Sequence, residues 1–171
     1  MKRKIYYTVI ENDLLGEVLI ASTAYGLCAV EFGDLSVQTI LNRLIWKNPE
    51  CDFQKDPLKL EEAAEEIKEY LNGKRRKFTL ALDLKNLTAF QSKTLDETMK
   101  IPYGKTESYR EVAGRIGVPR GARAVGNALA VNPIPIVVPC HRVISSNGEL
   151  GGYSTGIEYK RRLLDLETHH R

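Results

Sequence analysis

The two halves of the sequence differ in the spacing of their apolar residues, and this change constrains the fold more than any other feature. Three short apolar runs, each followed by turn-forming residues, occupy positions 5–9, 17–21 and 26–32. Short runs with this punctuation are typical of antiparallel strands. Later apolar residues recur every three or four positions, the spacing of amphipathic helices, over 36–46, 60–71 and 88–99. We therefore predict an α/β domain over 1–85 and a mainly α domain over 86–171.

Two further helices are predicted after this boundary, and they match the outline of a helix-turn-helix. Residues 107–116 have helical spacing, Gly117 stands where a left-handed residue ends a helix, and residues 120–130 resume the helical pattern. Thr88 is a plausible N-cap for the helix that precedes the pair.

The second helix of this pair has one long cation among very small residues: it reads Arg123, Ala124, Val125, Gly126, Asn127 and Ala128. Glycine inside a helix destabilises it by roughly 1 kcal/mol relative to alanine, so a lack of bulk is required there. One interpretation is close approach to the shallower groove of DNA, with Arg123 entering the base stack. The alternative is that the small residues pack against the preceding helix.

Charge and hydropathy exclude some classes of protein. The chain has no apolar run long enough to span a bilayer, and its basic start is not followed by the apolar stretch of a secretory signal. We therefore expect no membrane association and a cytoplasmic location, or a nuclear one if the source is eukaryotic. Up to Lys85 there are 13 Lys and Arg against 14 Asp and Glu, and from Asn86 onward 12 against 8. A basic second half permits nucleic-acid binding, whereas the run 74–77 is expected to be solvated surface.

The three cysteines, Cys28, Cys51 and Cys140, form no C-x-x-C pair, so neither a disulfide framework nor a cysteine-rich zinc site is expected. Cys28 and Cys51 are interpreted as small buried hydrophobic residues. Cys140 differs because Pro139 and His141 flank it inside the apolar run 134–144, which is predicted to be a strand.

A thiol of ordinary pKa is only a few per cent thiolate at neutral pH, so a nucleophilic cysteine needs a base or a cation beside it. His141 and Arg142 are candidates for these roles. Neighbouring residues of a regular strand point to opposite faces. A bend or a bridging water is therefore needed to bring His141 and Cys140 together.

The sequence Pro-Cys-His-Arg-Val at 139–143 is similar to the active-site signature of the O6-alkylguanine-DNA alkyltransferases. Four supporting motifs stand at the expected intervals, at 108–109, 123–126, 132–135 and 151–156, and the resemblance covers about 101–167. Thr155 departs from the family pattern, which often has glycine there, and would stiffen the loop over the base. The N-terminal zinc ligands of some vertebrate members are absent, so no metal is expected.

The resemblance implies a ribonuclease H-like first domain and a winged-helix-like second one. It also implies irreversible transfer of an alkyl group from O6-alkylguanine in DNA, with O4-alkylthymine as a second candidate substrate. Cys140 would be the nucleophile and His141 its base through a water, with Glu167 orienting the imidazole. Tyr109 would donate a proton to the departing guanine, and Asn132 would support the active-site turn.

The resemblance further implies a DNA surface and a base pocket. Arg123 resembles the residue that fills the stack vacated by the extruded nucleotide, and Ala124, Gly126 and Asn127 share its helix. The implied pocket residues are Pro135, Val143, Tyr153 and Ser154. No cofactor is expected, and the partner is double-stranded DNA containing alkylated guanine, bound by a monomer.

Three other functions remain open from the residues. A cysteine hydrolase would use Cys140 and His141 with turnover. A helix-turn-helix regulator would bind DNA without reacting. A catalytically inactive alkyltransferase-like protein is the third, although such proteins lack the cysteine that this chain has.

Overall fold

The computed structural model describes residues 2–170, and the chain divides between Asp83 and Leu84 into two compact units. The first unit is a four-stranded sheet with two helices. Its elements are β1 (Arg3–Asn12), β2 (Gly16–Thr23), β3 (Gly26–Glu31), α1 (Val37–Lys47), β4 (Cys51–Lys55), the 3₁₀ helix η1 (Leu58–Leu60) and α2 (Glu61–Leu71). The strand order is β3-β2-β1-β4.

The sheet is mixed, which corrects the expectation of an antiparallel sheet. Strands β1 to β3 are antiparallel neighbours, as predicted. Strand β4 was not predicted, and it pairs in parallel with β1. Parallel neighbours need a crossover connection, and α1 lies in the connection that leads to β4. The polar composition of the run 51–55 concealed this edge strand.

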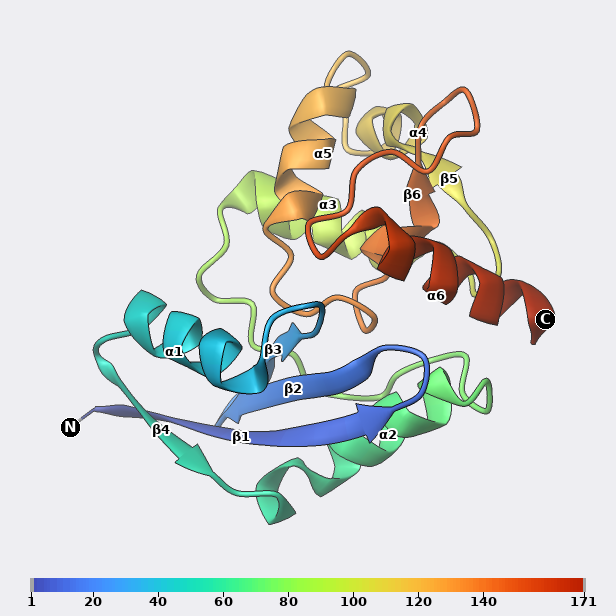
Figure 1. Cartoon of the computed structure of the whole chain (residues 1–171). Coiled ribbons are helices and arrows are strands. Elements are labelled where there is room, and N and C mark those ends of the chain that lie inside the picture. Colours follow the sequence, from blue (N-terminus) through green and yellow to red (C-terminus); the bar gives the residue numbers. More distant parts are fainter. Residues whose placement is uncertain (1, 171) are drawn as a thin grey trace. The chain divides into compact units, whose positions relative to one another are not determined.

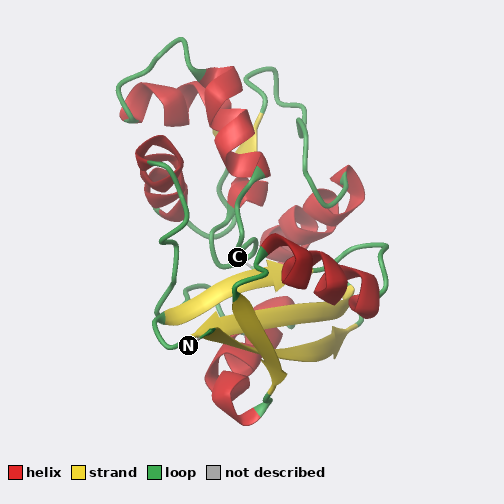
Figure 2. Ribbon diagram, turned by 90° about the vertical axis from the view of Figure 1, so that its left-hand side faces the viewer, coloured by secondary structure: helices red, strands yellow, loops and turns green. Residues whose placement is uncertain are grey.

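The two helices of the first unit cover opposite faces of its sheet (Figures 1 and 2). Helix α1 packs Ile40 and Leu41 into the cluster that also contains Ile5, Leu19, Ala21, Ala29 and Cys51. Helix α2 buries Ile67 and Tyr70 completely. Burial of these side chains explains why both helices were visible as apolar periodicity in the sequence.

The end of the first unit is fixed beside β3. Leu27 N donates to Ala81 O at 2.9 Å and Asp83 N donates to Leu27 O at 2.8 Å. The Asp83 carboxylate accepts hydrogen bonds from Arg3 and Thr23. Gly26 has a φ of 138°, and an added Cβ would lie 2.3 Å from Ala81 O, so only glycine fits this close approach.

The basic run 74–77 is not entirely solvated surface. The Arg75 side chain is 26% exposed and lies 2.7 Å from Glu69 Oε2 and 3.3 Å from Glu66 Oε1. Lys74 and Lys77 are exposed. One member of the run therefore holds its loop on α2, which a count of charges could not reveal.

The second unit is mainly helical, as predicted. Its elements are α3 (Ala89–Met99), β5 (Glu107–Ser108), α4 (Tyr109–Arg115), α5 (Ala122–Ala130), the 3₁₀ helix η2 (Cys140–Arg142), β6 (Val143–Ile144) and α6 (Ile157–His169). Thr88 caps α3 in a capping box with Gln91, which confirms the predicted N-cap. Helix α4 begins at Tyr109 rather than Glu107 because β5 pairs in parallel with β6.

Helices α4 and α5 form the predicted helix-turn-helix, with Gly117 in the turn at a φ of 84°. Along α5 the buried residues are Val125, Ala128 and Leu129, whereas Arg123, Ala124 and Asn127 are exposed. The larger apolar residues of α5 therefore make the intramolecular contacts, and small residues form its exposed face.

The prediction that 134–144 forms a strand is wrong. Only Val143–Ile144 is a strand, and Cys140–Arg142 is a turn of 3₁₀ helix. Cys140 N donates to Val138 O at 2.8 Å across Pro139, whose φ of −81° and ψ of 60° are those of an inverse γ-turn. The prolines of this segment lack the N–H that a central strand needs. Ile136 has a φ of 77°, an unusual conformation for a β-branched residue.

Within residues 2–170, no helix combines the length and apolar character that crossing a membrane requires.

Candidate active site

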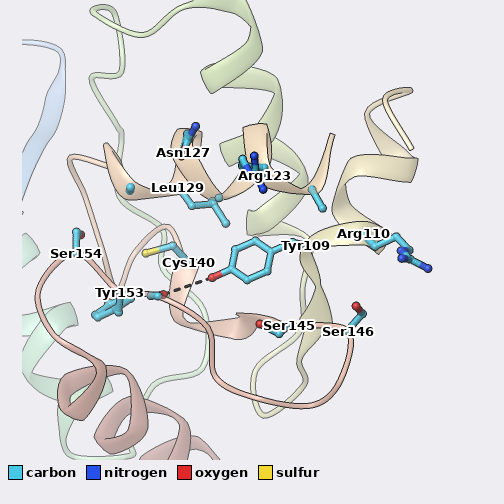
Figure 3. A pocket seen from close by; sticks show the side chains of 14 residues that line it. Tyr109, Arg110, Arg123, Asn127, Leu129, Cys140, Ser145, Ser146, Tyr153 and Ser154 are labelled. Atoms are coloured by element: carbon cyan, nitrogen blue, oxygen red, sulfur yellow. Dashed lines mark hydrogen bonds between the residues drawn. The ribbon is translucent and has the colours of Figure 1, made fainter. Parts of the chain in front are cut away.

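A pocket of about 690 Å³ lies in the second unit, with the Cys140 side chain at its wall (Figure 3). Its size is in the range of small-molecule and base-binding sites. Four segments supply its lining: the start of α4, the helix α5, Cys140 of η2 and the stretch 145–154. The described lining residues are Tyr109, Arg110, Ala122, Arg123, Gly126, Asn127, Leu129, Ala130, Cys140, Ser145, Ser146, Gly152, Tyr153 and Ser154.

Asn132 fixes the sulfur of Cys140 and the turn that presents it. Its Nδ2 donates to Cys140 Sγ at 3.2 Å and to Val138 O at 3.0 Å. Its Oδ1 accepts from Ile134 N at 3.0 Å. One carboxamide thus satisfies two backbone groups of the irregular segment and also points a donor at the sulfur. Asn132 is well placed to support the active-site turn.

The Cys140 thiol is 6% exposed. Burial raises its pKa above the ordinary value, while hydrogen bonds from Asn132 and Tyr153 and the charge of Lys160 act in the opposite direction. Burial is the larger effect. The free protein therefore holds a thiol at neutral pH, and reaction requires a base.

His141 and Glu167 form a completely buried pair in the same unit. His141 Nε2 lies 2.8 Å from Glu167 Oε1. Burial lowers the pKa of His141, although the Glu167 carboxylate favours protonation. Burial alone would raise the pKa of Glu167, but hydrogen bonds and charges from His141 and Arg142 lower it to about 2. The arrangement has the form of an imidazole base oriented by a carboxylate.

The 3₁₀ turn over 140–142 supplies the bend that a regular strand would have lacked. The Arg142 guanidinium is directed to Glu167 and not to the sulfur, because its Nη2 donates to Glu167 Oε1 at 2.8 Å. The interpretation of Arg142 as a cation beside the thiol is therefore wrong.

Lys160, on α6, is a cation whose charge acts on the Cys140 sulfur, and no sequence pattern had pointed to it. The residue is completely buried. Its Nζ donates to Val143 O at 2.6 Å, to Gly152 O at 3.3 Å and to Tyr109 Oη at 3.5 Å. Burial lowers its pKa from 10.5 to about 8, and the nearby Cys140 acts in the opposite direction. Three carbonyl or hydroxyl oxygens compensate the buried ammonium group.

Tyr109 is the first residue of α4 and forms one side of the pocket. Its hydroxyl donates to Gly152 O at 3.4 Å. Burial, followed by the nearness of Cys140, raises the pKa of Tyr109, so the hydroxyl keeps its proton at neutral pH. A protonated phenol that lines the same pocket as the Cys140 thiol is able to donate its proton to a group bound there.

Gly126 is not explained by packing within the protein. A Cβ added there would approach Tyr109 no closer than 3.7 Å, which is an ordinary van der Waals contact. Together with the exposed Ala124 and Asn127, this favours the interpretation that a surface outside the chain approaches α5 closely.

The predicted site residues fall into three groups. Those on the pocket lining are Tyr109, Arg123, Gly126, Asn127, Cys140, Tyr153 and Ser154. Asn132, His141 and Glu167 are not among the lining residues: Asn132 contacts Cys140, and His141 contacts Glu167. Ala124 is exposed on α5 but is not among the lining residues.

Pro135 and Val143, predicted as pocket residues, are buried away from the lining. The backbone of Val143 is engaged internally, since its N–H donates to Cys140 O and its carbonyl accepts from Lys160. Leu129 and Ser145 line the pocket instead. The choice of Pro135 and Val143 as pocket residues rested on the resemblance alone.

Comparison with known proteins agrees with this arrangement. Residues 5–84 match the family model described as the ribonuclease-like domain of 6-O-methylguanine DNA methyltransferase, and residues 89–169 match its DNA-binding domain. An inducible methylated-DNA–protein-cysteine methyltransferase of Bacillus subtilis is 43% identical over 86% of this chain and 82% of its own length. The methylated-DNA–protein-cysteine methyltransferase of Methanosarcina barkeri is 38% identical over 95% of this chain and 97% of its own.

A solved structure leads to the same family. The Mycobacterium tuberculosis OGT in complex with DNA superimposes with a TM-score of 0.82 and 35% identity, covering 98% of this chain and 94% of the other. The two family models together cover nearly the whole chain, and these relatives and this structure match it over most of its length, so the chain belongs to the 6-O-methylguanine DNA methyltransferase family.

Proposed function

We propose that this protein repairs alkylated DNA directly, by moving the alkyl group from the O6 atom of guanine to Cys140. One observation supports this most: a buried thiol stands at the wall of a base-sized pocket that opens beside the helix-turn-helix. A nucleotide must leave the double helix to reach such a sulfur, at a cost of a few kcal/mol.

The proposed chemistry forms one C–S bond and breaks one C–O bond. The thiol proton passes through a water to His141, and the sulfur attacks the alkyl carbon. The electron pair of the C–O bond moves to the guanine oxygen, and Tyr109 supplies a proton to the guanine ring. Lys160, hydrogen-bonded to the Tyr109 hydroxyl, is placed to stabilise the negative charge in this part of the site. The products are unmodified guanine and a thioether on Cys140, which is stable to water, so each molecule acts once.

The proposed DNA surface is the exposed face of α5. Ala124, Gly126 and Asn127 let the helix backbone approach the shallow groove, and Arg123 fills the space left by the extruded nucleotide. We propose double-stranded DNA containing alkylguanine as the substrate, O4-alkylthymine as a second one, and a monomer as the active form. Because the substrate is chromosomal DNA, the protein acts in the compartment that holds it, the cytoplasm or, in a eukaryote, the nucleus.

The decisive experiment is the mass of the intact protein after incubation with duplex DNA containing isotopically labelled O6-methylguanine. We expect one methyl group per chain, located on Cys140, and none in the Cys140→Ser variant. A Cys51→Ser variant serves as the matched control and should accept one methyl group. Repeated turnover with an unmodified thiol would instead indicate a cysteine hydrolase, and binding without transfer would indicate a regulator.

The role of Arg123 is tested separately, with two substrates. Arg123→Ala should slow the repair of duplex DNA strongly, because the vacated stack is no longer filled, while its reaction with free O6-alkylguanine stays near the original rate. Single-turnover rates on both substrates measure the difference. An equal fall in rate on both substrates would show that Arg123 does not fill the vacated stack.

A further inference from the structure

Arg142 has no role in the chemistry described so far, although it is 6% exposed and immediately follows His141. Its guanidinium binds the Glu167 carboxylate along one edge. Nε lies 3.0 Å from Oε1 and 3.1 Å from Oε2, and Nη2 lies 2.8 Å from Oε1. The remaining nitrogen, Nη1, donates to Ile101 O at 2.7 Å. Every guanidinium nitrogen therefore has an acceptor, and the cation is held in one orientation.

Both carboxylate oxygens of Glu167 likewise have several hydrogen-bond donors around them. Besides Arg142, its Oε2 accepts from Gly104 N at 2.8 Å, and its Oε1 is hydrogen-bonded to His141 Nε2 at 2.8 Å. A carboxylate surrounded by obligate donors accepts from all of them. Nε2 must therefore be the protonated nitrogen of the imidazole, and in the neutral ring the lone pair is on Nδ1.

The charge balance around the imidazole depends on the same contact. A buried carboxylate without a counter-ion would draw a second proton onto the neighbouring ring, and a protonated imidazole is not a base. Arg142 cancels that charge. Besides Glu167 and Arg142, the charged group among the described residues that acts on His141 is Lys160, from α6. Lys160 and Arg142 both disfavour a second proton on the ring.

We propose that Arg142 is a positioning residue, which neutralises Glu167 and thereby keeps His141 as a neutral imidazole with its proton on Nε2 and its basic lone pair on Nδ1. This inference rests on the proposed function, in which His141 is the base. It explains why a third buried group accompanies the histidine and the carboxylate.

The first test observes the ring directly. In wild-type protein selectively labelled with 15N-histidine, the His141 resonances at neutral pH should show one protonated and one unprotonated nitrogen, with the proton on Nε2. Assignment of the signal is made by comparison with His141→Gln. An imidazolium at neutral pH, or a proton on Nδ1, would overturn the proposal. This measurement does not depend on methyl transfer, so it stands even if the proposed function fails.

The second test compares the pH profiles of single-turnover methyl transfer for Arg142→Gln and Arg142→Lys. Without the cation, Glu167 favours the imidazolium, so the acidic limb of the Arg142→Gln profile should move to higher pH by at least about one unit, with the rate recovering in alkali. Arg142→Lys retains the charge and should keep the original midpoint at a reduced rate.

Arg161→Gln, on the exposed face of α6, is the matched control and should leave the profile unchanged. A purely structural role for Arg142 predicts slower transfer at every pH with no movement of the midpoint, and that result would contradict the proposal. If Arg142→Gln does not fold, the nitrogen resonances of the wild-type protein still test the protonation state of His141 that the proposal requires, and an imidazolium at neutral pH would overturn it.

Discussion

Cys28 in the first unit and Cys140 in the second are both shielded thiols, yet their surroundings are opposite in character. Cys28 Sγ donates to Ala21 O at 3.4 Å, and burial, followed by the negative charge of Asp83, raises its pKa to about 12. Cys140 Sγ accepts a hydrogen bond from Asn132, and its neighbours Asn132, Tyr153 and Lys160 all favour the thiolate.

Exposure alone would have selected the wrong residue, because Cys28 is more exposed than Cys140. A sulfur that donates to a carbonyl is held as a thiol, and a sulfur that accepts from an amide is prepared to become an anion. The direction of the hydrogen bond therefore distinguishes the packing cysteine, Cys28, from the proposed nucleophile, Cys140.

The largest expected effect comes from replacing the hydrogen-bond donor that Asn132 directs at Cys140 Sγ with a negatively charged acceptor. Asn132→Asp removes the donor and places a negative charge beside the sulfur, so the rate of methyl transfer at neutral pH should fall about 100-fold. Single-turnover kinetics measure it, with thermal unfolding recorded in parallel. Asn42→Asp, at an exposed position of α1, is the control. A variant that folds and reacts at the original rate would show that the hydrogen bond does not prepare the sulfur.

A smaller effect is expected from removing the cation near Cys140. Lys160→Met should slow the transfer roughly 10-fold, because a nearby opposite charge stabilises the thiolate by about one pKa unit. The pKa of Lys160 is about 8, so it is charged below that pH and neutral above it. The ratio of the wild-type rate of methyl transfer to the rate of Lys160→Met should thus be greatest below pH 8, and it should fall as the pH rises further. A rate ratio that does not change with pH would contradict this role of Lys160. Lys68→Met, at an exposed position of α2, serves as the control.

The smallest effect is expected at the other thiol. Cys28→Ser retains a donor for Ala21 O, so the free energy of unfolding should change by less than about 1 kcal/mol and methyl transfer should be unaffected. Chemical denaturation and the intact-mass assay measure the two quantities. Loss of transfer in this variant would show that the first unit contributes to the reaction.

The sequence predicted the elements whose signals are local. Thr88, followed by apolar residues at helical spacing, predicted α3, and Gly117 predicted the turn of the helix-turn-helix. Strand β4 was missed because a polar edge strand has no distinctive periodicity, and its parallel pairing depends on a helix crossover rather than on its own residues.

The candidate site was less accessible to sequence reasoning where partners lie far apart along the chain. The motif around Cys140 singled out the thiol and the neighbouring histidine as candidates, but the apolar run 134–144 suggested a strand in place of a turn. Arg142 was assigned to the wrong neighbour, because its partner Glu167 is 25 residues away. Lys160 had no signal, since a single lysine in an amphipathic helix is usually solvated.

The left-handed backbone at Ile136 concerns how much motion the segment before Cys140 needs. Such a conformation in a β-branched residue stores about 1–3 kcal/mol, and it persists only where the surroundings enforce it. In an enzyme that cycles, a rigid loop of this kind would slow the release of product. A molecule that reacts a single time, as proposed for this protein, does not need rapid release for a further cycle, so selection can hold Cys140 still without any penalty in throughput.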